Sequence, residues 1–301
     1  MSRFDALDIG LVVAAHGRHV MVETPEGERL LCHPRGKKSD LVVGDRVRWL
    51  PTADAGVVEK IETRRNLFFR QDEWRTKSFA ANLDQVLVLV SGEPMFSESQ
   101  LARALIAARQ ADIPVLIGMN KTDLPSAALA RERLLPYRRM GAELVELSLK
   151  RGAEASRAAL APLLAGRTTL VLGPSGVGKS TLINLLIPDA AALVGEISQA
   201  LAAGRHTTTS TLWYWLDATR QAALIDSPGF QEFGLRQIEA EQLATLMPDI
   251  HAALGHCRFY NCTHRSEPGC GVRAALERGE VAATRYKIYL DLHDELSQKR
   301  Y

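Results

Sequence analysis

The sequence has no long hydrophobic run, few cysteines and almost no net charge. No apolar stretch approaches the ~18–20 residues that a membrane-spanning helix needs. The N-terminal MSRFDALDIG carries acids where a signal peptide has an apolar core, so we expect a cytoplasmic protein without a membrane partner. The formal net charge of +2 neither demands nor excludes nucleic acid. An RNA-binding hypothesis must therefore depend on the fold and on local basic patches.

Three of the four cysteines fall in the pattern Cys257-x4-Cys262-x-His264-x5-Cys270. In a cytosolic chain such clustering favours a metal site over disulfide bonds. Three thiolates and an imidazole suit a tetrahedral Zn²⁺ site, and without an open position the zinc is expected to be structural. The alternative is a set of free or buried cysteines. Cys32 lies alone and is interpreted as a small buried apolar residue.

With 301 residues, 46% apolar and 24% charged, the chain suggests two or three globular domains. Its first part contains five short apolar runs broken by turn signals, which predicts a small β-barrel, with the OB-fold as the natural candidate. We predict an OB-fold RNA-binding domain over residues 1–72. Its basic residues indicate either a phosphate-contacting face or, equally, solvated loop charge. They are Arg35, Lys37, Lys38, Arg64, Arg65 and Arg70.

From about residue 82 onward, apolar runs of strand length such as NLDQVLVLVSG and IPVLIGMN alternate with helical stretches. This pattern predicts a largely parallel sheet with helices on both faces, which we assign to residues 73–235. After Phe230 the strand patterns stop, and residues 236–301 are predicted to form a helical zinc-binding domain. In its last helices, Arg285 is interpreted as a phosphate contact or, equally, as part of a solvated face.

GPSGVGKS fits the phosphate-binding pattern G-x-x-x-x-G-K-[ST], after the apolar run TTLVL and before the helical run STLINLLIP. Its glycines allow backbone N–H groups to surround phosphates, and the helix N-terminus adds positive potential. Lys179 is predicted to bridge the β- and γ-phosphates, and Ser180 to ligate Mg²⁺. The loop alone does not separate ATP from GTP. The predicted nucleotide-binding residues here are Gly173, Pro174, Ser175, Gly176, Val177, Gly178, Lys179, Ser180 and Thr181.

The stretch NKTD, from Asn120 to Asp123, favours guanine. It follows the apolar run IPVLIGM, at the strand end where ligands bind in such sheets. As a carboxylate, Asp123 can accept from guanine N1–H and the 2-amino group, two donors that adenine lacks. Asn120 can address N7 and O6 and tie loops together, Lys121 can lay its stem along the base, and Thr122 completes the motif. Ser148 begins an SLK stretch, similar to the S-A-K loop whose backbone contacts O6 in GTPases.

Two further elements concern Mg²⁺ and the γ-phosphate. DSPG supplies Asp226, predicted to hold Mg²⁺ through water, and Gly229, whose N–H is predicted to meet the γ-phosphate. GRHTTT supplies a threonine for Mg²⁺, with Thr208 favoured and Thr207 and Thr209 as close alternatives. Along the chain these elements keep the usual cyclic order of a GTPase, cut at a different point. We therefore predict a circularly permuted P-loop GTPase domain.

Nearly the whole chain resembles one known protein family. The motifs that carry the resemblance are NKTD, GPSGVGKST, GRHTTT, DSPGF, AANLDQVLVLVS and the cysteine pattern. It resembles the bacterial small-ribosomal-subunit-dependent GTPases of the circularly permuted RsgA (YjeQ) type. The resemblance implies an N-terminal OB-fold, a central permuted GTPase and a C-terminal zinc domain. It also implies hydrolysis of GTP to GDP, binding to the 30S subunit and its 16S rRNA, and stimulation of hydrolysis by that subunit during late maturation.

Phe230 stands just after DSPG, where many GTPases have a glutamine that orients the attacking water. Phenylalanine cannot hydrogen-bond water, so we expect slow intrinsic hydrolysis and a water-positioning group from elsewhere. His206 is the candidate. The alternative is that His206 shapes the switch loop or touches RNA.

The sequence leaves two classes of function open. One is an assembly GTPase whose hydrolysis drives release from the small subunit, and the other is a nucleotide-gated RNA-binding module whose hydrolysis is incidental. A P-loop enzyme acting on a small metabolite is a third interpretation, but it would not explain NKTD. The oligomeric state cannot be read from the sequence, and a monomer is the simplest expectation.

Overall fold

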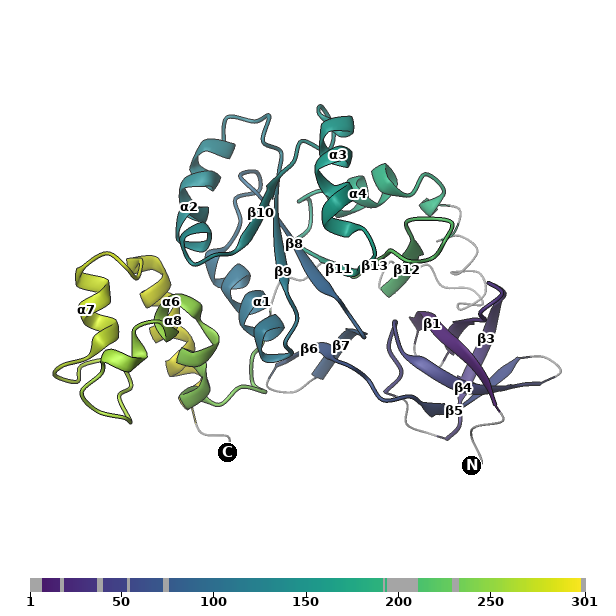
Figure 1. The fold of residues 1–301 in the computed structure, drawn as a ribbon, viewed down its shortest axis with the longest axis horizontal. Coiled ribbons are helices and arrows are strands. Elements are labelled where there is room, and N and C mark those ends of the chain that lie inside the picture. The colour runs from purple at the N-terminus through teal and green to yellow at the C-terminus, as the bar shows by residue number, and fades with distance from the viewer. Residues whose placement is uncertain are drawn as a thin grey trace.

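The computed structural model describes residues 7–16, 19–36, 40–52, 55–72, 76–191, 193, 211–228 and 233–298. Figure 1 shows three units side by side: an N-terminal barrel, a central layered α/β unit and a small helical C-terminal unit. Within these residues, no helix is both long and apolar enough to cross a membrane.

Five strands form the N-terminal barrel. They are β1 (Asp8–His16), β2 (His19–Glu23), β3 (Arg29–Pro34), β4 (Arg46–Pro51) and β5 (Gly56–Ile61). The order β1-β2-β3-β5-β4 closes on itself because β4 also pairs with β1, and β3 runs parallel to β5. Val12, Val22, Trp49 and the fully buried Cys32 fill the interior. The closed barrel confirms the predicted OB-type fold, and Cys32 is a buried apolar residue as predicted.

A two-stranded hairpin, absent from the predicted elements, connects the barrel to the central unit. Its strands are β6 (Leu67–Gln71) and β7 (Thr76–Ala81). Phe68 and Phe79 pack against Phe233, the next residue that the structure describes after Pro228. The rings of Phe79 and Phe233 are stacked, with centroids 5.9 Å apart. The predicted boundary between residues 72 and 73 falls between these two paired strands.

The central unit is a six-stranded sheet flanked by helices. Its strands are β8 (Gln85–Ser91), β9 (Val115–Asn120), β10 (Glu143–Glu146), β11 (Thr168–Leu172), β12 (Thr211–Trp215) and β13 (Ala223–Asp226). The order is β10-β9-β8-β11-β13-β12, and all neighbouring pairs are parallel except β12 with β13. Every residue of β8 is buried, because helices cover both faces of the sheet, and this explains its continuous apolar run.

Four helices cover this sheet. They are α1 (Glu98–Gln110), α2 (Ala127–Arg139), α3 (Ala153–Leu164) and α4 (Lys179–Leu186). In Figure 1, α1 and α2 lie on the side nearer the C-terminal unit, and α3 and α4 on the other side. α1 begins where Ser97 Oγ accepts the N–H of Gln100 at 3.3 Å, a helix-capping bond. The arrangement confirms the predicted parallel sheet with flanking helices.

The central sheet continues into the barrel. Ala14 and Ala15 of β1 pair antiparallel with Leu212 and Thr211 of β12, so eleven strands form one hydrogen-bonded sheet. The register of β1 against β2 shifts between Val12 and Ala14, a β-bulge at the point where the other edge of β1 changes partner from β4 to β12. The barrel is therefore an extension of the central sheet, not a module on a loose tether.

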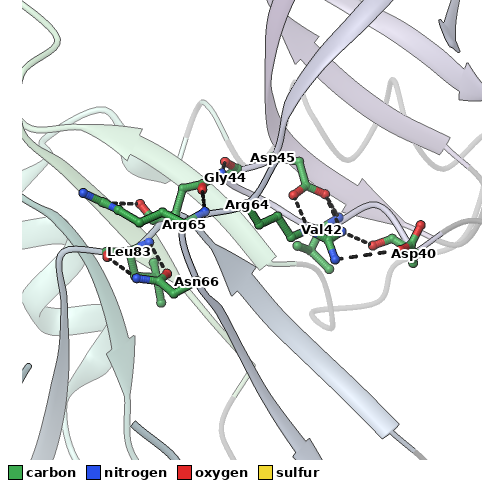
Figure 2. A network of polar contacts seen from close by, with 9 residues as sticks. Asp40, Val42, Gly44, Asp45, Arg64, Arg65, Asn66 and Leu83 are labelled. Atoms are coloured by element: carbon green, nitrogen blue, oxygen red, sulfur yellow. Dashed lines mark hydrogen bonds and ion pairs between the residues drawn. The ribbon is translucent and has the colours of Figure 1, made fainter. Parts of the chain in front are cut away.

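A polar network makes a second contact between the barrel and the central unit (Figure 2). The fully buried side chain of Asp45 accepts from Arg64 Nε at 2.7 Å, from Arg64 Nη2 at 2.9 Å and from the N–H of Val42 at 2.9 Å. Asn82 Nδ2 donates to the C=O of Gly44 at 2.8 Å. Arg64 was a candidate for phosphate contact, but its pairing with Asp45 gives it a structural role at this junction.

The C-terminal unit is helical. Its elements are α6 (Pro248–His251), α7 (Gly271–Glu277), α8 (Ala283–Ser297) and the 3₁₀ turns Ala240–Leu246 and Leu254–His256. Arg285 of α8 donates to both carboxylate oxygens of Asp249 at 2.8 and 2.9 Å, and its guanidinium lies 5.1 Å from the ring centroid of Tyr137 in α2. Only 1% of Arg285 is exposed. Both predictions for Arg285 are therefore wrong, because it is an internal ion-pair residue.

Candidate nucleotide and metal sites

Asn120 ends β9 and is buried. Its Nδ2 donates to the C=O of Val177 in the phosphate loop at 2.8 Å, and its Oδ1 accepts the N–H of Leu149 at 3.1 Å. The side chain thereby ties together the loops that follow β9, β10 and β11. Both ends of the amide are satisfied within the protein, so the structure shows the loop-tying role, and contact with guanine N7 and O6 stays a prediction.

Lys121 and Thr122 hold the guanine motif against its neighbours. Lys121 has a left-handed backbone with φ of 61°, and its Nζ donates to the C=O of Gly176 at 2.8 Å. Thr122 Oγ1 donates to the C=O of Leu147 at 3.0 Å, just beyond β10. Although 55 residues separate Lys121 from Gly176 in the chain, the fold brings the two motifs into direct contact.

Asp123 is fixed by its neighbours. Its Oδ1 accepts from Ser148 Oγ at 2.7 Å, and Arg151 Nε lies 3.5 Å from its Oδ2. The hydrogen bond from Ser148 is the main reason why the pKa of Asp123 lies below its ordinary value, with a smaller contribution from Arg151. The carboxylate is therefore kept ionised and oriented. The predicted role of Ser148 was through its backbone, whereas the structure shows its side chain orienting Asp123.

The phosphate loop turns sharply between β11 and α4. Gly176 and Gly178 have φ of 77° and 112°, backbone conformations that other residues rarely adopt. A Cβ on Gly178 would lie 2.3 Å from Asn120 Nδ2. Glycine is therefore needed at position 178 for two reasons: the turn, and the close packing of the guanine motif against it.

Lys179 and Asp226 lie at the phosphate end of this arrangement. Lys179 Nζ donates to the C=O groups of Gly173 and Pro174 at 2.7 and 3.1 Å. Burial lowers the pKa of Lys179 and raises the pKa of Asp226, and the attraction between the two charges opposes both shifts. Asp226 Oδ1 is buried without a hydrogen-bond partner among the residues that the structure describes. Such an oxygen is costly to bury unless a cation or ordered water satisfies it.

A cleft of about 460 Å³ unites the two motifs, a size suited to a small-molecule ligand. The predicted residues that line it are Asn120, Lys121, Asp123, Gly176, Gly178, Lys179, Ser180 and Thr181. Leu124 and Arg151 line it too, although they are not among the predicted residues. They directly follow NKTD and SLK, so adjacency to the motifs was the available signal. Ser175 is exposed in the phosphate loop and does not line this cleft.

Several predicted residues lie outside the part of the chain that the structure describes. They are His206, Thr207, Thr208, Thr209, Gly229 and Phe230. Their roles stay predictions.

The predicted metal ligands come together in the C-terminal unit. Cys257, Cys262, His264 and Cys270 place their ligand atoms within 4.8 Å of one another. His264 Nδ1 lies 3.5 Å from Cys257 Sγ and 3.6 Å from Cys270 Sγ. The N–H of Gly271 points to Cys257 Sγ at 3.4 Å, a bond that favours the thiolate. Burial lowers the pKa of His264 and so favours the neutral imidazole that a metal needs.

Comparison with known proteins gives the same interpretation. Residues 61–236 match the model of the RsgA GTPase family. The chain is 62% identical over 297 residues to the small ribosomal subunit biogenesis GTPase RsgA of Variovorax paradoxus, an alignment that covers 97% of this chain and 93% of that protein. This chain belongs to the RsgA GTPase family.

Other members are similar over the same length. The RsgA protein of Burkholderia pseudomallei is 52% identical over 292 residues, covering 96% of this chain and 92% of the relative. The crystal structure of YjeQ from Thermotoga maritima matches with a TM-score of 0.75 and 30% identity over 97% of this chain and 99% of that one. The crystal structure of YloQ, described as a circularly permuted GTPase, matches with a TM-score of 0.70 and 25% identity over 100% and 99%. The predicted family and permuted fold are confirmed.

Proposed function

We propose that this member of the RsgA GTPase family hydrolyses GTP on the small ribosomal subunit and assists its late maturation. The shared cleft carries the first half of the proposal, because β9 and β11 both flank β8 and bring the guanine motif and the phosphate loop to one ligand. The names of the relatives, small ribosomal subunit biogenesis GTPases, support the second half.

Asp123 supplies the preference for guanine. Its ionised carboxylate, oriented by Ser148, matches the two donors of guanine. Asp123→Asn replaces an acceptor with an amide N–H, which suits xanthine because xanthine has a carbonyl at C2. Asn keeps one acceptor oxygen but loses the charge and the acceptor for the 2-amino group, so we expect GDP affinity to fall by about a hundredfold and xanthosine diphosphate to bind better than GDP. Asp189→Asn, at an exposed position, is the control, and an unchanged preference for GDP in Asp123→Asn would contradict this assignment.

Mg²⁺ fits the residues at the phosphate end of the cleft. Ser180 and Asp226 offer hard oxygen ligands, and the unpartnered, buried Oδ1 of Asp226 suits a hydrated cation. Mg²⁺ bound with GTP neutralises phosphate charge. Lys179 stands at the start of α4, where phosphate oxygens can replace the two carbonyl groups that its ammonium now contacts.

His206 is proposed to position the attacking water, since Phe230 cannot. We expect His206→Ala to lower kcat on the small subunit by about a hundredfold, the lower end of what a positioned acid–base group contributes. GDP affinity should stay unchanged. If kcat with subunits is the same in His206→Ala and in the unsubstituted protein, His206 has no catalytic role.

The Cys₃His group is proposed to bind one structural Zn²⁺. Three sulfurs and one neutral imidazole are a common structural zinc set, and four protein ligands leave no position open for catalysis. We assign residues 236–301 to this zinc-binding domain, residues 73–235 to the GTPase and residues 1–72 to RNA binding. We further propose that the protein is cytoplasmic and contacts 16S rRNA, because its proposed partner is the small ribosomal subunit. We propose a monomer as the simplest oligomeric state.

One measurement tests the proposed partner. GTP turnover is measured alone, with purified small subunits and with large subunits as the control. Stimulation by small subunits alone is the expected result, and equal turnover in all three conditions would contradict the ribosomal part of the proposal.

A further inference from the structure

One row of paired residues runs from the barrel to Asp226, whose charge acts on Lys179 of the phosphate loop. Ala14 of β1 pairs with Leu212 of β12, Leu212 pairs with Asp226 of β13, and Asp226 pairs with Val171 of β11. A single strand, β12, therefore separates the barrel from the strand that ends in Asp226. Because strand pairing fixes both spacing and register, β12 cannot shift without moving a neighbour on one side or the other.

The other end of β12 is held by a buried carboxylate of the barrel. Glu23 of β2 is only 5% exposed, and its Oε1 accepts from the indole Nε1 of Trp215 at 2.7 Å. Its Oε2 accepts from Arg29 Nε at 2.8 Å. Arg220, in the turn between β12 and β13, lies 3.8 Å from Glu23 and donates to the C=O of Pro25 at 3.3 Å. The bond from Trp215 to the buried carboxylate, with the two contacts of Arg220, connects the end of β12 and the β12–β13 turn to the barrel.

The two sides also meet electrostatically in the middle of β12. Tyr214 is buried there, and its pKa is raised to about 12. Burial is the main cause, the charge of Asp226 acts in the same direction, and the charge of Arg29 opposes both. Tyr214 thus lies within reach of both the metal-binding candidate and the barrel cation that pairs with Glu23.

We propose that Glu23 is a positioning residue for Asp226, and that the barrel influences GTP turnover through β12. The inference rests on the proposed function, in which Asp226 serves Mg²⁺ and the barrel side meets the subunit. Glu23 contacts neither nucleotide nor metal; it holds β12 and its turn, and β12 holds Asp226 in register. The experiment measures how strongly Glu23 affects GTP turnover, because a continuous path of contacts does not determine the size of that effect.

The test compares two buried barrel carboxylates. Glu23→Ala removes the contact with β12. Glu59→Ala is the matched control: the Glu59 side chain is 5% exposed, against 4% for Glu23, and it pairs with Arg35 at 2.6 Å within the barrel. Steady-state kcat and KM for GTP are measured with and without purified small subunits. Glu23→Gln, which keeps an acceptor for the indole, is the conservative variant.

We expect Glu23→Ala to lower kcat with subunits by about tenfold, the lower end of the loss found when a group that orients a metal ligand is removed. KM for GTP should stay within about twofold, because the guanine motif follows β9, four places away from β12 in the sheet. Glu23→Gln should fall between Glu23→Ala and the unsubstituted protein. An unchanged kcat in Glu23→Ala, an equal loss in Glu59→Ala, or a rise in KM alone would each overturn the proposal.

Failure of the proposed function and misfolding of the variant can each be distinguished from failure of the positioning role. If the unsubstituted protein is not stimulated by subunits, the proposed partner is wrong, and the positioning role is then decided by kcat without subunits, measured in the same way. If Glu23→Ala does not fold, Arg220→Ala replaces it, since the Arg220 side chain is 37% exposed. A lower kcat at constant KM in Arg220→Ala supports the inference, and an unchanged kcat overturns it.

Discussion

The central GTPase unit is joined to its two neighbours in different ways. On the barrel side the junction is made by backbone pairing between β1 and β12 and by the hydrogen-bond network around Asp45. On the C-terminal side it is made mainly by side chains: the guanidinium of Arg285 lies over Tyr137 of α2, and Arg103 of α1 pairs with Glu295 of α8. The backbone contributes a single bridge there, between Gln71 of β6 and Leu235, among the residues that the structure describes.

The two junctions differ in how strictly they fix the barrel and the C-terminal unit relative to the GTPase unit. A strand ladder fixes register, and a slip of one residue would reverse every side chain. Side-chain contacts allow two surfaces to rotate against each other, and clefts of about 340 and 580 Å³ lie between α1, α2 and the C-terminal unit. We therefore expect the barrel and the GTPase to behave as one cooperative unit and the C-terminal unit to be separable. The following predictions test that expectation, beginning with the largest effect.

Loss of the metal should unfold the C-terminal unit and leave the other two units folded. Structural zinc contributes about 10–16 kcal/mol of apparent folding free energy in small zinc domains. Cys270→Ala is therefore expected to abolish zinc binding and unfold the C-terminal unit while GDP affinity is retained. Zinc content per chain and GDP titration measure both. Cys32→Ala, in the barrel, is the control and should keep its zinc; full zinc occupancy in Cys270→Ala would contradict the assigned ligand set.

The buried ion pair at the C-terminal side should make the next largest contribution to the stability of that unit, after the metal. Arg285→Met leaves the buried carboxylate of Asp249 without its cation, so we expect a loss of about 3–5 kcal/mol in the free energy of unfolding. Arg278→Met breaks the exposed pair with Glu280 and should cost much less, because solvent screens the attraction between exposed charges. Chemical denaturation followed by circular dichroism gives both values. Equal losses in the two variants would show that burial of Arg285 contributes nothing.

The matching test at the barrel side is Arg64→Met. It leaves the buried Asp45 with the N–H of Val42 but without the guanidinium, and we expect a loss of about 1.5–3 kcal/mol, the range for hydrogen bonds to a charged group. Lys60→Met, which breaks a half-exposed pair with Glu62 within the barrel, is the control. The barrel and the GTPase unit should still unfold in a single transition. Separate transitions in Arg64→Met would mean that β1–β12 pairing alone does not join them.

The smallest predicted effect lies inside the GTPase unit, away from both junctions. The hydrogen bond from Ser148 lowers the pKa of Asp123, and guanine needs the ionised form. GDP affinity should therefore be present above this pKa and lost as pH falls through it. Ser148→Ala raises the pKa of Asp123, so the loss should begin at higher pH. GDP titrations at decreasing pH measure the shift; coincident curves for Ser148→Ala and the unsubstituted protein would contradict it.

The clustering of the candidate nucleotide and metal residues could be predicted from the sequence because these motifs have short, fixed spacings. The phosphate loop needs glycines at turns such as Gly178, and the metal needs four ligands within a short segment. The order of the motifs also predicted the permuted sheet, since strand ends in a parallel sheet converge on one edge.

Contacts between distant segments could not be predicted in this way. Arg285 was placed at the surface because a charged residue on a helix usually lies there, and only the fold shows that Asp249 and Tyr137 surround it. The hairpin of β6 and β7 was missed because its pattern is weak until Phe233 packs on Phe68 and Phe79. The pairing of β1 with β12 has no local signal, because neither strand carries a mark of its partner.

The pairing of β1 with β12 also has a consequence for the order in which the chain folds. The barrel strands are close in sequence and can close early, but the partner of Ala14 lies about two hundred residues further along the chain. Contacts of such large sequence separation carry a high loop-closure entropy and form late. In a ribosome-bound nascent chain, the barrel would therefore emerge and fold first. The edge of β1 that pairs with β12 would stay unpaired until β12 has been synthesised.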